Sequence, residues 1–351
     1  MVRRLSTHLM LRPEDVPPSA SDWEVIGAFN PGAVKVGNEV VLLVRVAERP
    51  RELRPGFTAL PRWSPDAGFT IDWVANEELE LVDPRVVRRF ADGLLRLTFV
   101  SHLRLAYSRD GKTIDRFGEA ALNPATIDEE YGVEDPRITP IDGRYYVTYV
   151  AVSRHGAATA LASTTDFKTF ERHGIIFCPE NKDVVLFPER VGGRYVALHR
   201  PNAATRFSRP QMWIASSPDL IHWGQHKYLY GGQHEWESGR IGGGTPPILT
   251  RDGWLEIYHG NLRTTVPGDV GAYFGAAMLL DRHDPTRVVA TGREPILTPT
   301  EEFEREGFVA NVVFPTAVVP NDGQLLIYYG ASDKYTGVVE MSQADISATL
   351  E

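Results

Sequence analysis

Two adjacent carboxylates, Glu134 and Asp135, stand directly before a proline at the start of a strand-like run, in the sequence YGVEDPRITP (131–140). Pro136 fixes its own φ and should push the residue before it into an extended conformation. An acidic side chain held in this way points in one direction, which general acid–base chemistry requires. An ordinary turn uses the same residue types, so this stretch alone leaves both interpretations open.

Three basic side chains lie inside or at the end of apolar runs that are typical of strands. They are Arg45 in LLVRVAERP, Arg200 in VALHRPN and His259 in EIYHGN. A buried charge without a partner is costly, so each of these residues needs an ion pair or an anionic ligand. A structural salt bridge is the simpler interpretation, and an anionic ligand is the functional alternative.

The elements that must position these residues repeat along the chain. A turn with glycine, where a tight hairpin requires a positive φ, is followed each time by a β-rich run. A strand of small residues, an Asp-containing turn and an aromatic-bearing strand then follow several of these runs. The unit is a four-stranded antiparallel meander of about 50 residues, which matches a β-propeller blade. The β-rich runs are 36–46, 91–100, 141–150, 191–200, 251–260 and 321–330.

We therefore predict an all-β fold, a five-bladed β-propeller that forms one domain over residues 1–351, with a short N-terminal extension at 1–25. Residues 36–118 fit either one elaborated blade or two simple ones, but 49–63 resembles an insertion within one blade, which favours five. No long segment has the period of a helix. Because the inner strands of a propeller converge on a central channel, polar residues at their starts are expected to meet there.

The composition excludes several classes of function. A formal net charge of −9 argues against a nucleic-acid or anionic-membrane partner, because phosphate groups attract basic surfaces. The single cysteine, Cys178, cannot form an intrachain disulfide, and its neighbours predict a buried thiol. We read no signal peptide, no run of about 18 apolar residues that could span a bilayer and no metal-binding motif. We expect a cytoplasmic protein without a metal or other cofactor.

Three long motifs resemble glycoside hydrolase family 130, which consists mostly of inverting β-mannoside phosphorylases on five-bladed propellers. The motifs are GVEDPRITPIDGRYYVTYVAVSRHG (132–156), KDVVLFPERVGGRYVALHRP (182–201) and IGGGTPPILTRDGWLEIYHG (241–260). The resemblance extends from about Asn30 to about Asp333. It implies phosphorolysis of a β-linked mannoside, with inorganic phosphate as co-substrate and α-mannose 1-phosphate as product.

The resemblance also implies a role for each site residue. Asp135 corresponds to the general acid, which is expected to protonate the glycosidic oxygen through a hydroxyl of the sugar. Partial burial and the neighbouring Glu134 are expected to raise the pKa of Asp135. Glu134 itself is expected to brace Arg137 or a sugar hydroxyl. The predicted phosphate-binding residues are Lys182, Arg200, Arg240, His259 and Tyr273. The predicted mannoside-binding residues are Asn30, Arg45, Arg49, Glu134 and Asp333, of which Arg49 matches least well.

A phosphorylase and a hydrolase make different demands on charge. An inverting hydrolase needs a second carboxylate as base, whereas a phosphate nucleophile is repelled by a carboxylate and attracted by cations. The basic cluster therefore favours phosphorolysis. Glu235 and Glu237 in QHEWESGR could still supply the base of a β-mannosidase, and a sugar-binding propeller without catalysis is a further alternative. The expected partners are a β-mannoside oligosaccharide and phosphate, with no nucleic acid and no membrane; a homo-oligomer is left open.

Overall fold

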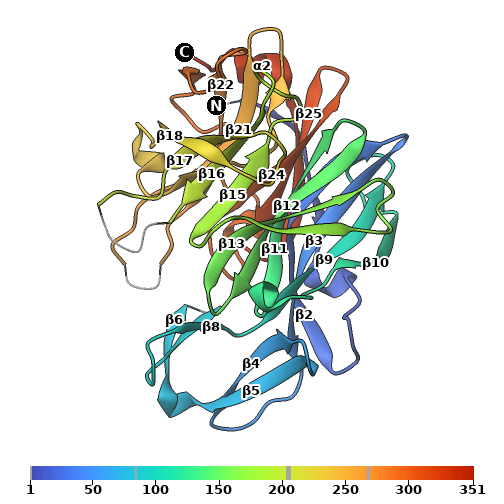
Figure 1. Ribbon diagram of the computed structural model, residues 1–351, viewed down its shortest axis with the longest axis vertical. Helices are drawn as coiled ribbons and strands as arrows, with labels where there is room; N and C mark the ends of the chain where they lie inside the picture. Colours follow the sequence, from blue (N-terminus) through green and yellow to red (C-terminus); the bar gives the residue numbers. More distant parts are fainter. Residues whose placement is uncertain (1, 84, 203–206, 267–268) are drawn as a thin grey trace.

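The computed structural model describes residues 2–83, 85–202, 207–266 and 269–351 (Figure 1). Within these residues the long strands form five antiparallel blades, each built around one of the predicted meanders; a single parallel bridge between Gly132 and Ser101 joins the first two blades into one sheet. The predicted all-β fold, a five-bladed β-propeller, is confirmed. Helices are short: α1 (Glu302–Arg305), α2 (Gln343–Ser347) and the 3-10 turns Pro13–Asp15, Asn76–Glu78, Ile127–Glu129 and Glu235–Glu237.

The first three blades follow one another along the chain, each with its innermost strand first. The first blade consists of β2 (Trp23–Val36), β3 (Glu39–Pro50), β9 (Val100–Ser108) and β10 (Arg116–Leu122). The second consists of β11 (Gly132–Ile141), β12 (Arg144–Ser153), β13 (Gly156–Thr164) and β14 (Glu171–Phe177). The third consists of β15 (Asn181–Leu186), β16 (Tyr195–Pro201), β17 (Met212–Ser217) and β18 (Gly224–Tyr230).

The fourth blade has a divided inner strand, and the fifth takes its outer strand from the other end of the chain. In the fourth, β19 (Ile241–Gly242) and β20 (Ile248–Leu249) both pair with β21 (Trp254–Asn261), followed by β22 (Tyr273–Leu280) and β23 (Val288–Thr291). The fifth consists of β24 (Val313–Asn321), β25 (Gln324–Ala331), β26 (Tyr335–Ser342) and β1 (Arg4–Leu11).

Strand β1 changes the interpretation of the N-terminal segment. Residues 1–25 were expected to form a short extension, but β1 pairs antiparallel with β26 and so completes the fifth blade. Strand β2, the inner strand of the first blade, begins within the same segment at Trp23. The propeller is thus closed by hydrogen bonds between strands from opposite ends of the chain.

The first blade is a single elaborated blade, as predicted, but its insertion is longer than 49–63. Residues 51–99 separate β3 from β9 and form a hairpin and a small sheet that project from the blades (Figure 1). The interpretation of 91–100 as a blade strand was wrong, because most of this run belongs to the insertion. The hairpin is β4 (Phe57–Ser64) and β5 (Gly68–Ala75), and the sheet is β6 (Leu79–Asp83), β7 (Val86–Arg89) and β8 (Leu95–Leu97).

The predicted hairpin turns have the expected backbone. Asp142 and Gly143 connect β11 to β12 with φ values of 50° and 78°. Asp322 and Gly323 connect β24 to β25 with φ values of 47° and 79°. Positive φ at both central residues defines the type I′ turn, whose twist matches that of the flanking strands.

The apolar core lies between neighbouring blades, because successive residues of a strand face opposite sides of its sheet. In β3, Leu42 and Val44 pack against the fifth blade, whereas Val41 and Leu43 pack against the second. Equivalent clusters join the other neighbouring blades. This packing fixes the inner strands around the channel that their first residues line.

Two sequence expectations concern single features of the described residues. Cys178 was predicted to be buried, but it is exposed. No helix in the described part of the chain combines the length and the apolar character that crossing a membrane requires.

Candidate active site

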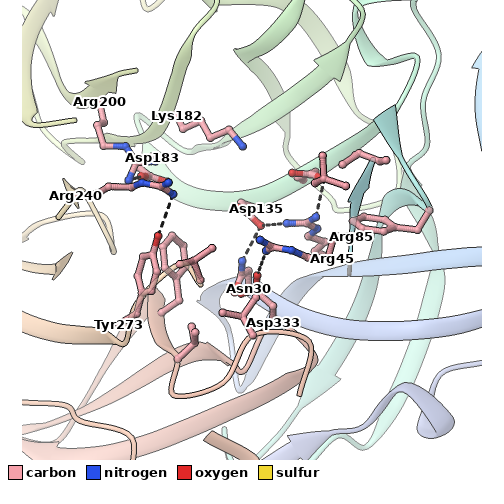
Figure 2. A pocket seen from close by; sticks show the side chains of 18 residues that line it. Asn30, Arg45, Arg85, Asp135, Lys182, Asp183, Arg200, Arg240, Tyr273 and Asp333 are labelled. Carbon is pink, nitrogen blue, oxygen red and sulfur yellow. Dashed lines mark hydrogen bonds and ion pairs between the residues drawn. The ribbon is translucent and has the colours of Figure 1, made fainter. Parts of the chain in front are cut away.

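A cavity of about 220 Å³ opens where the inner strands meet. Figure 2 shows basic side chains around Asp183 on one side and the group around Asp135 on the other. Most of the residues predicted from the sequence line this cavity, although they come from all five blades. They are Asn30, Arg45, Glu134, Asp135, Lys182, Arg200, Arg240, Tyr273 and Asp333.

The backbone at the starts of three inner strands is left-handed. Asn30, Asp135 and Asp183 have φ values of 48°, 48° and 56°, in a region that residues other than glycine seldom adopt. Each lies at a bulge, where the strand register with its neighbour shifts. The bulge interrupts the alternation of side chains, so Glu134 and Asp135 both face the cavity, as do Lys182 and Asp183. Asp135 was expected to be extended before its proline, and the bulge is why it is not.

Asp135 is held by two hydrogen bonds to the same carboxylate oxygen. Asn30 Nδ2 donates to Oδ1 at 2.8 Å and Arg45 Nη1 donates to it at 2.9 Å. Arg45 also donates through Nη2 to Glu134 Oε1 at 2.6 Å and through Nε to Ser101 Oγ at 3.1 Å. The predicted brace between Glu134 and Arg137 is thus a brace to Arg45.

The expected rise in the pKa of Asp135 was wrong for the free protein. Burial does raise the pKa of this carboxyl, but the positive charges of Arg45 and Arg137, with Asn30 and Lys182, outweigh it. The pKa of Asp135 therefore lies below its ordinary value. Sequence reasoning counted the neighbouring carboxylate and omitted the guanidinium that lies between the two acids.

On the opposite side, Asp183 gathers three basic groups. Its Oδ2 lies 2.7 Å from Arg200 Nη1 and 3.3 Å from His259 Nε2, and its Oδ1 lies 3.5 Å from Arg137 Nη2. His259 is fully buried and lies behind Asp183 and Arg200; it does not line the cavity. Burial lowers the pKa of His259 despite the adjacent carboxylate, which favours the neutral imidazole.

Lys182 and Arg240 complete the basic side of the cavity. Lys182 is the cross-strand neighbour of Arg200 on β15 and β16. Arg240 Nη1 donates to Tyr273 Oη at 3.3 Å. Within the described residues, neither Lys182 nor Arg240 forms a salt bridge with a carboxylate, so both charges are available to a ligand in the cavity.

The sequence prediction missed Arg85 and Asp183, and it included Arg49, which lies elsewhere. Arg49 is about half exposed and its Nε pairs with Glu24 Oε1 at 2.6 Å. Arg85, from the insertion, lines the cavity and contacts both Asp83 and Asp333. A signal for Arg85 was available, because the insertion contains the same Asp-Pro-Arg sequence as the stretch around Asp135.

The two glutamates considered as a hydrolytic base do not line the cavity. Glu237 is buried and accepts hydrogen bonds at 2.9 Å from the hydroxyls of Tyr230 and Tyr258, and two more from backbone N–H groups. Glu235 is exposed. Glu237 therefore stabilises its loop.

No group of three or more His, Cys, Asp or Glu side chains suitable for a metal ion occurs within the described residues. The cavity instead combines a carboxyl held by Asn30 and Arg45 with cations on the facing wall. Such a site suits a neutral polar ligand, such as a sugar, together with an anion.

Comparisons with known proteins match this chemistry. The model of glycoside hydrolase family 130, described as beta-1,4-mannooligosaccharide phosphorylase, matches residues 69–351. The chain is 38% identical over 359 residues to the beta-1,2-mannobiose phosphorylase of Listeria innocua serovar 6a, covering 100% of this chain and 98% of the relative. It is 39% identical over 252 residues to the 1,2-beta-oligomannan phosphorylase of Thermoanaerobacter sp. (strain X514), covering 71% of this chain and 81% of that protein. The solved complex of beta-1,2-mannobiose phosphorylase from Listeria innocua with beta-1,2-mannobiose is similar at a TM-score of 0.91 and 37% identity, covering 98% of this chain and 99% of that one.

Proposed function

The chain belongs to glycoside hydrolase family 130, and we propose that it is a phosphorylase that cleaves a β-linked mannoside with inversion, releasing α-mannose 1-phosphate. One observation carries the proposal: the cavity sets the Asp135 carboxyl opposite Lys182 and Arg240, two cations that form no salt bridge with a carboxylate of the described residues. The relatives support the same reaction, since those compared above are named as mannoside phosphorylases.

Phosphate is the nucleophile in this reaction. Lys182, Arg200, Arg240 and the Tyr273 hydroxyl hold the phosphate on the basic wall, so one of its oxygens faces the anomeric carbon. The new C–O bond forms on the face opposite the leaving oxygen, which converts a β-mannoside into α-mannose 1-phosphate. Phosphate carries a charge of about −1.5 to −2 at neutral pH. The basic side chains of the cavity wall stabilise the negative charge of the phosphate oxygens as it is redistributed in the transition state.

Asp135 supplies the proton that the leaving oxygen needs, either directly or through a sugar hydroxyl. In the free protein the positive neighbours keep this carboxyl below its ordinary pKa. A bound phosphate offsets part of that positive field, which raises the pKa of Asp135 when the nucleophile is present. The site thus couples the arrival of phosphate to the protonation of the acid.

The mannoside occupies the space between these two groups. Asn30, Arg45 and Glu134 lie on the acid side, and Asp333 faces the cavity from the fifth blade. These groups offer the hydrogen-bond donors and acceptors that sugar hydroxyls require. We propose a β-1,2 linkage, because the listerial relative and the Thermoanaerobacter relative both carry this linkage in their names.

A β-mannosidase is less well supported. A hydrolytic base needs a carboxylate free to activate water across the sugar. The other acids that line the cavity are engaged: Glu134 by Arg45, Asp183 by Arg200 and Asp333 by Arg85. A cytoplasmic location stays a prediction, and the formation of a homo-oligomer stays open.

The direct test incubates the protein with β-1,2-, β-1,3- and β-1,4-mannobiose, each with and without phosphate. We expect α-mannose 1-phosphate to accumulate only with phosphate, and fastest from the β-1,2 isomer. Release of free mannose at the same rate without phosphate would refute phosphorolysis. Binding of mannobiose without any turnover would instead support a sugar-binding propeller.

A further inference from the structure

Asp183 lies at the centre of the basic wall, where a carboxylate looks unfavourable for an anion site. It is buried and lines the cavity beside Lys182. Its carboxylate contacts groups from three blades: Arg200 from the same blade, Arg137 from the second and His259 from the fourth. The acid is therefore the common partner of the buried basic residues.

The contacts of Arg200 divide its guanidinium into two parts. Nη1 lies 2.7 Å from Asp183 Oδ2, an ion pair in which Oδ2 accepts no hydrogen bond from the described residues, and its hydrogen bond is to His259 Nε2 at 3.2 Å. Nε of Arg200 has no hydrogen-bond partner among the described residues, although it is buried and the side chain lines the cavity. One part of the guanidinium is thus fixed by protein, while a buried donor remains unused.

A close approach of the backbone accommodates the carboxylate. A Cβ atom on Gly242, at the start of the fourth blade, would lie 2.4 Å from Asp183 Oδ2 and 2.7 Å from His259 Cε1. Any side chain at this position would have to displace the acid or the imidazole. The fourth blade therefore leaves room for the Asp183 carboxylate at the junction of the blades.

We propose that Asp183 is a positioning residue of the anion site: its carboxylate holds the buried guanidinium of Arg200 so that the unused donor meets phosphate. This inference rests on the proposed phosphorolysis. Without Asp183, Arg137 and Arg200 would repel each other and Arg200 could adopt other rotamers. The favourable effect of orientation exceeds the repulsion between this carboxylate and phosphate, because Arg200 already neutralises much of that charge.

The test is whether the KM for phosphate rises or falls when the charge of Asp183 is removed. Asp183→Asn removes a negative charge at nearly constant shape. If Asp183 acted on phosphate only through charge, its removal would lower the KM for phosphate. A positioning role predicts the opposite: the KM for phosphate rises about tenfold or more, since a buried ion pair that orients Arg200 is lost, while the KM for β-1,2-mannobiose changes by less than about twofold.

A second variant perturbs the position of the Asp183 carboxylate without changing any charge. Gly242→Ala places a methyl group against the Asp183 carboxylate and should also raise the KM for phosphate selectively. Near-ultraviolet circular dichroism checks that each variant is folded. Asp252→Asn, which alters an exposed carboxylate of a turn in the fourth blade, is the matched control and should leave both KM values unchanged.

The outcomes separate the inference from the proposed function. Wild-type turnover that does not depend on phosphate would overturn the proposed function itself. Phosphate-dependent wild-type turnover, with an unchanged or lowered KM for phosphate in Asp183→Asn, would overturn only the positioning role. If Asp183→Asn does not fold, Gly242→Ala decides, and an unchanged KM for phosphate in that variant overturns the inference.

Discussion

Asn30 and Asp135 share the same left-handed backbone, with φ at 48° in each, and their side chains meet at 2.8 Å between Nδ2 and Oδ1. Both residues precede a proline and lie at a bulge in the inner strand of their blade. Backbone of this kind costs free energy and is concentrated at functional sites. The contact orients the Asp135 carboxylate in the absence of any ligand.

Asp135→Asn is expected to remove the proton donor while keeping the shape of the side chain. Turnover of β-1,2-mannobiose should fall by about 10² to 10⁴, the usual contribution of a general acid. Binding of the sugar, measured by calorimetry, should persist, and a melting curve checks the fold. Turnover within a fewfold of wild type would show that another group donates the proton.

Arg200→Ala is expected to weaken phosphate binding, because it removes a buried cation from the cavity wall. The KM for phosphate should rise at least about tenfold, with a smaller change in the KM for the mannoside. Initial rates over both substrate concentrations measure the two constants. An unaltered phosphate dependence would remove Arg200 from the anion site. Arg194→Ala, in the same blade and outside the cavity, is the control.

Arg85→Ala tests the residue that the insertion contributes. Arg85 is paired with Asp333 at the mannoside side of the cavity, so its loss should disorder that carboxylate. We expect the KM for mannoside to rise about tenfold with little change in the KM for phosphate. Arg88→Ala alters an exposed ion pair of the same insertion and should change neither constant. Equal effects of the two substitutions would contradict a specific role for Arg85.

Glu237→Gln separates a structural glutamate from a hydrolytic base. The variant should retain phosphorolysis, because Glu237 does not line the cavity. Its free energy of unfolding should fall by about 1–3 kcal/mol, since an amide cannot accept all four hydrogen bonds of the carboxylate. Denaturant unfolding measures the loss, and Glu235→Gln, on an exposed residue, should show none. Loss of turnover in a folded Glu237→Gln protein would reopen the hydrolase alternative.

Buried histidines, among them His102 and His199, predict how stability depends on pH. Burial, together with the charge of Arg104, lowers the pKa of His102 to about 4; burial and His226 lower that of His199 to about 3. Below the unfolded value of about 6.5, the unfolded chain binds protons that the folded protein excludes. These groups should therefore reduce the free energy of unfolding as pH falls from about 6.5 towards 4, and have no effect above about 7.

Urea unfolding at a series of pH values measures this dependence. His102→Gln should flatten the slope between pH values of about 6.5 and 4, because it removes one of the protons that the folded protein excludes. His222→Gln, which changes an exposed histidine, serves as control. An identical slope in His102→Gln and wild type would contradict this prediction, because it would show that folding does not change the pKa of His102.

The sequence predicted the propeller because its repeats are local. Each Asp-Gly or Gly-containing turn requires a positive φ and is followed by its own strand, so the blades can be recognised one by one. The cavity residues followed from the symmetry of the blades, which brings the starts of the inner strands together. Asn30 and Lys182, at the starts of inner strands, could therefore be expected at one channel, whereas Tyr273 was assigned only through the resemblance to glycoside hydrolase family 130.

The remaining features depend on contacts between distant parts of the chain. The left-handed φ of Asp135 arises from a bulge, and its lowered pKa arises from Arg45, on another blade. Whether His259 lines the cavity or lies behind Asp183 depends on how far its side chain lies from the cavity surface. Neither the periodicity of the sequence nor the spacing of its motifs specifies that distance. Arg85 lines the cavity because part of the insertion, including Val86 and Leu97, reaches it.

The pairing of β1 with β26 also has a consequence for synthesis. Strand β1 is synthesised before the other blade strands but cannot pair until they have been made, since the fifth blade cannot be completed before residue 342 has emerged. Such sequence-distant pairing slows folding, and an unpaired strand edge invites association with other chains. The nascent protein must therefore carry β1 unpaired while the first four blades are synthesised, which makes this short segment the natural one for a chaperone to shield.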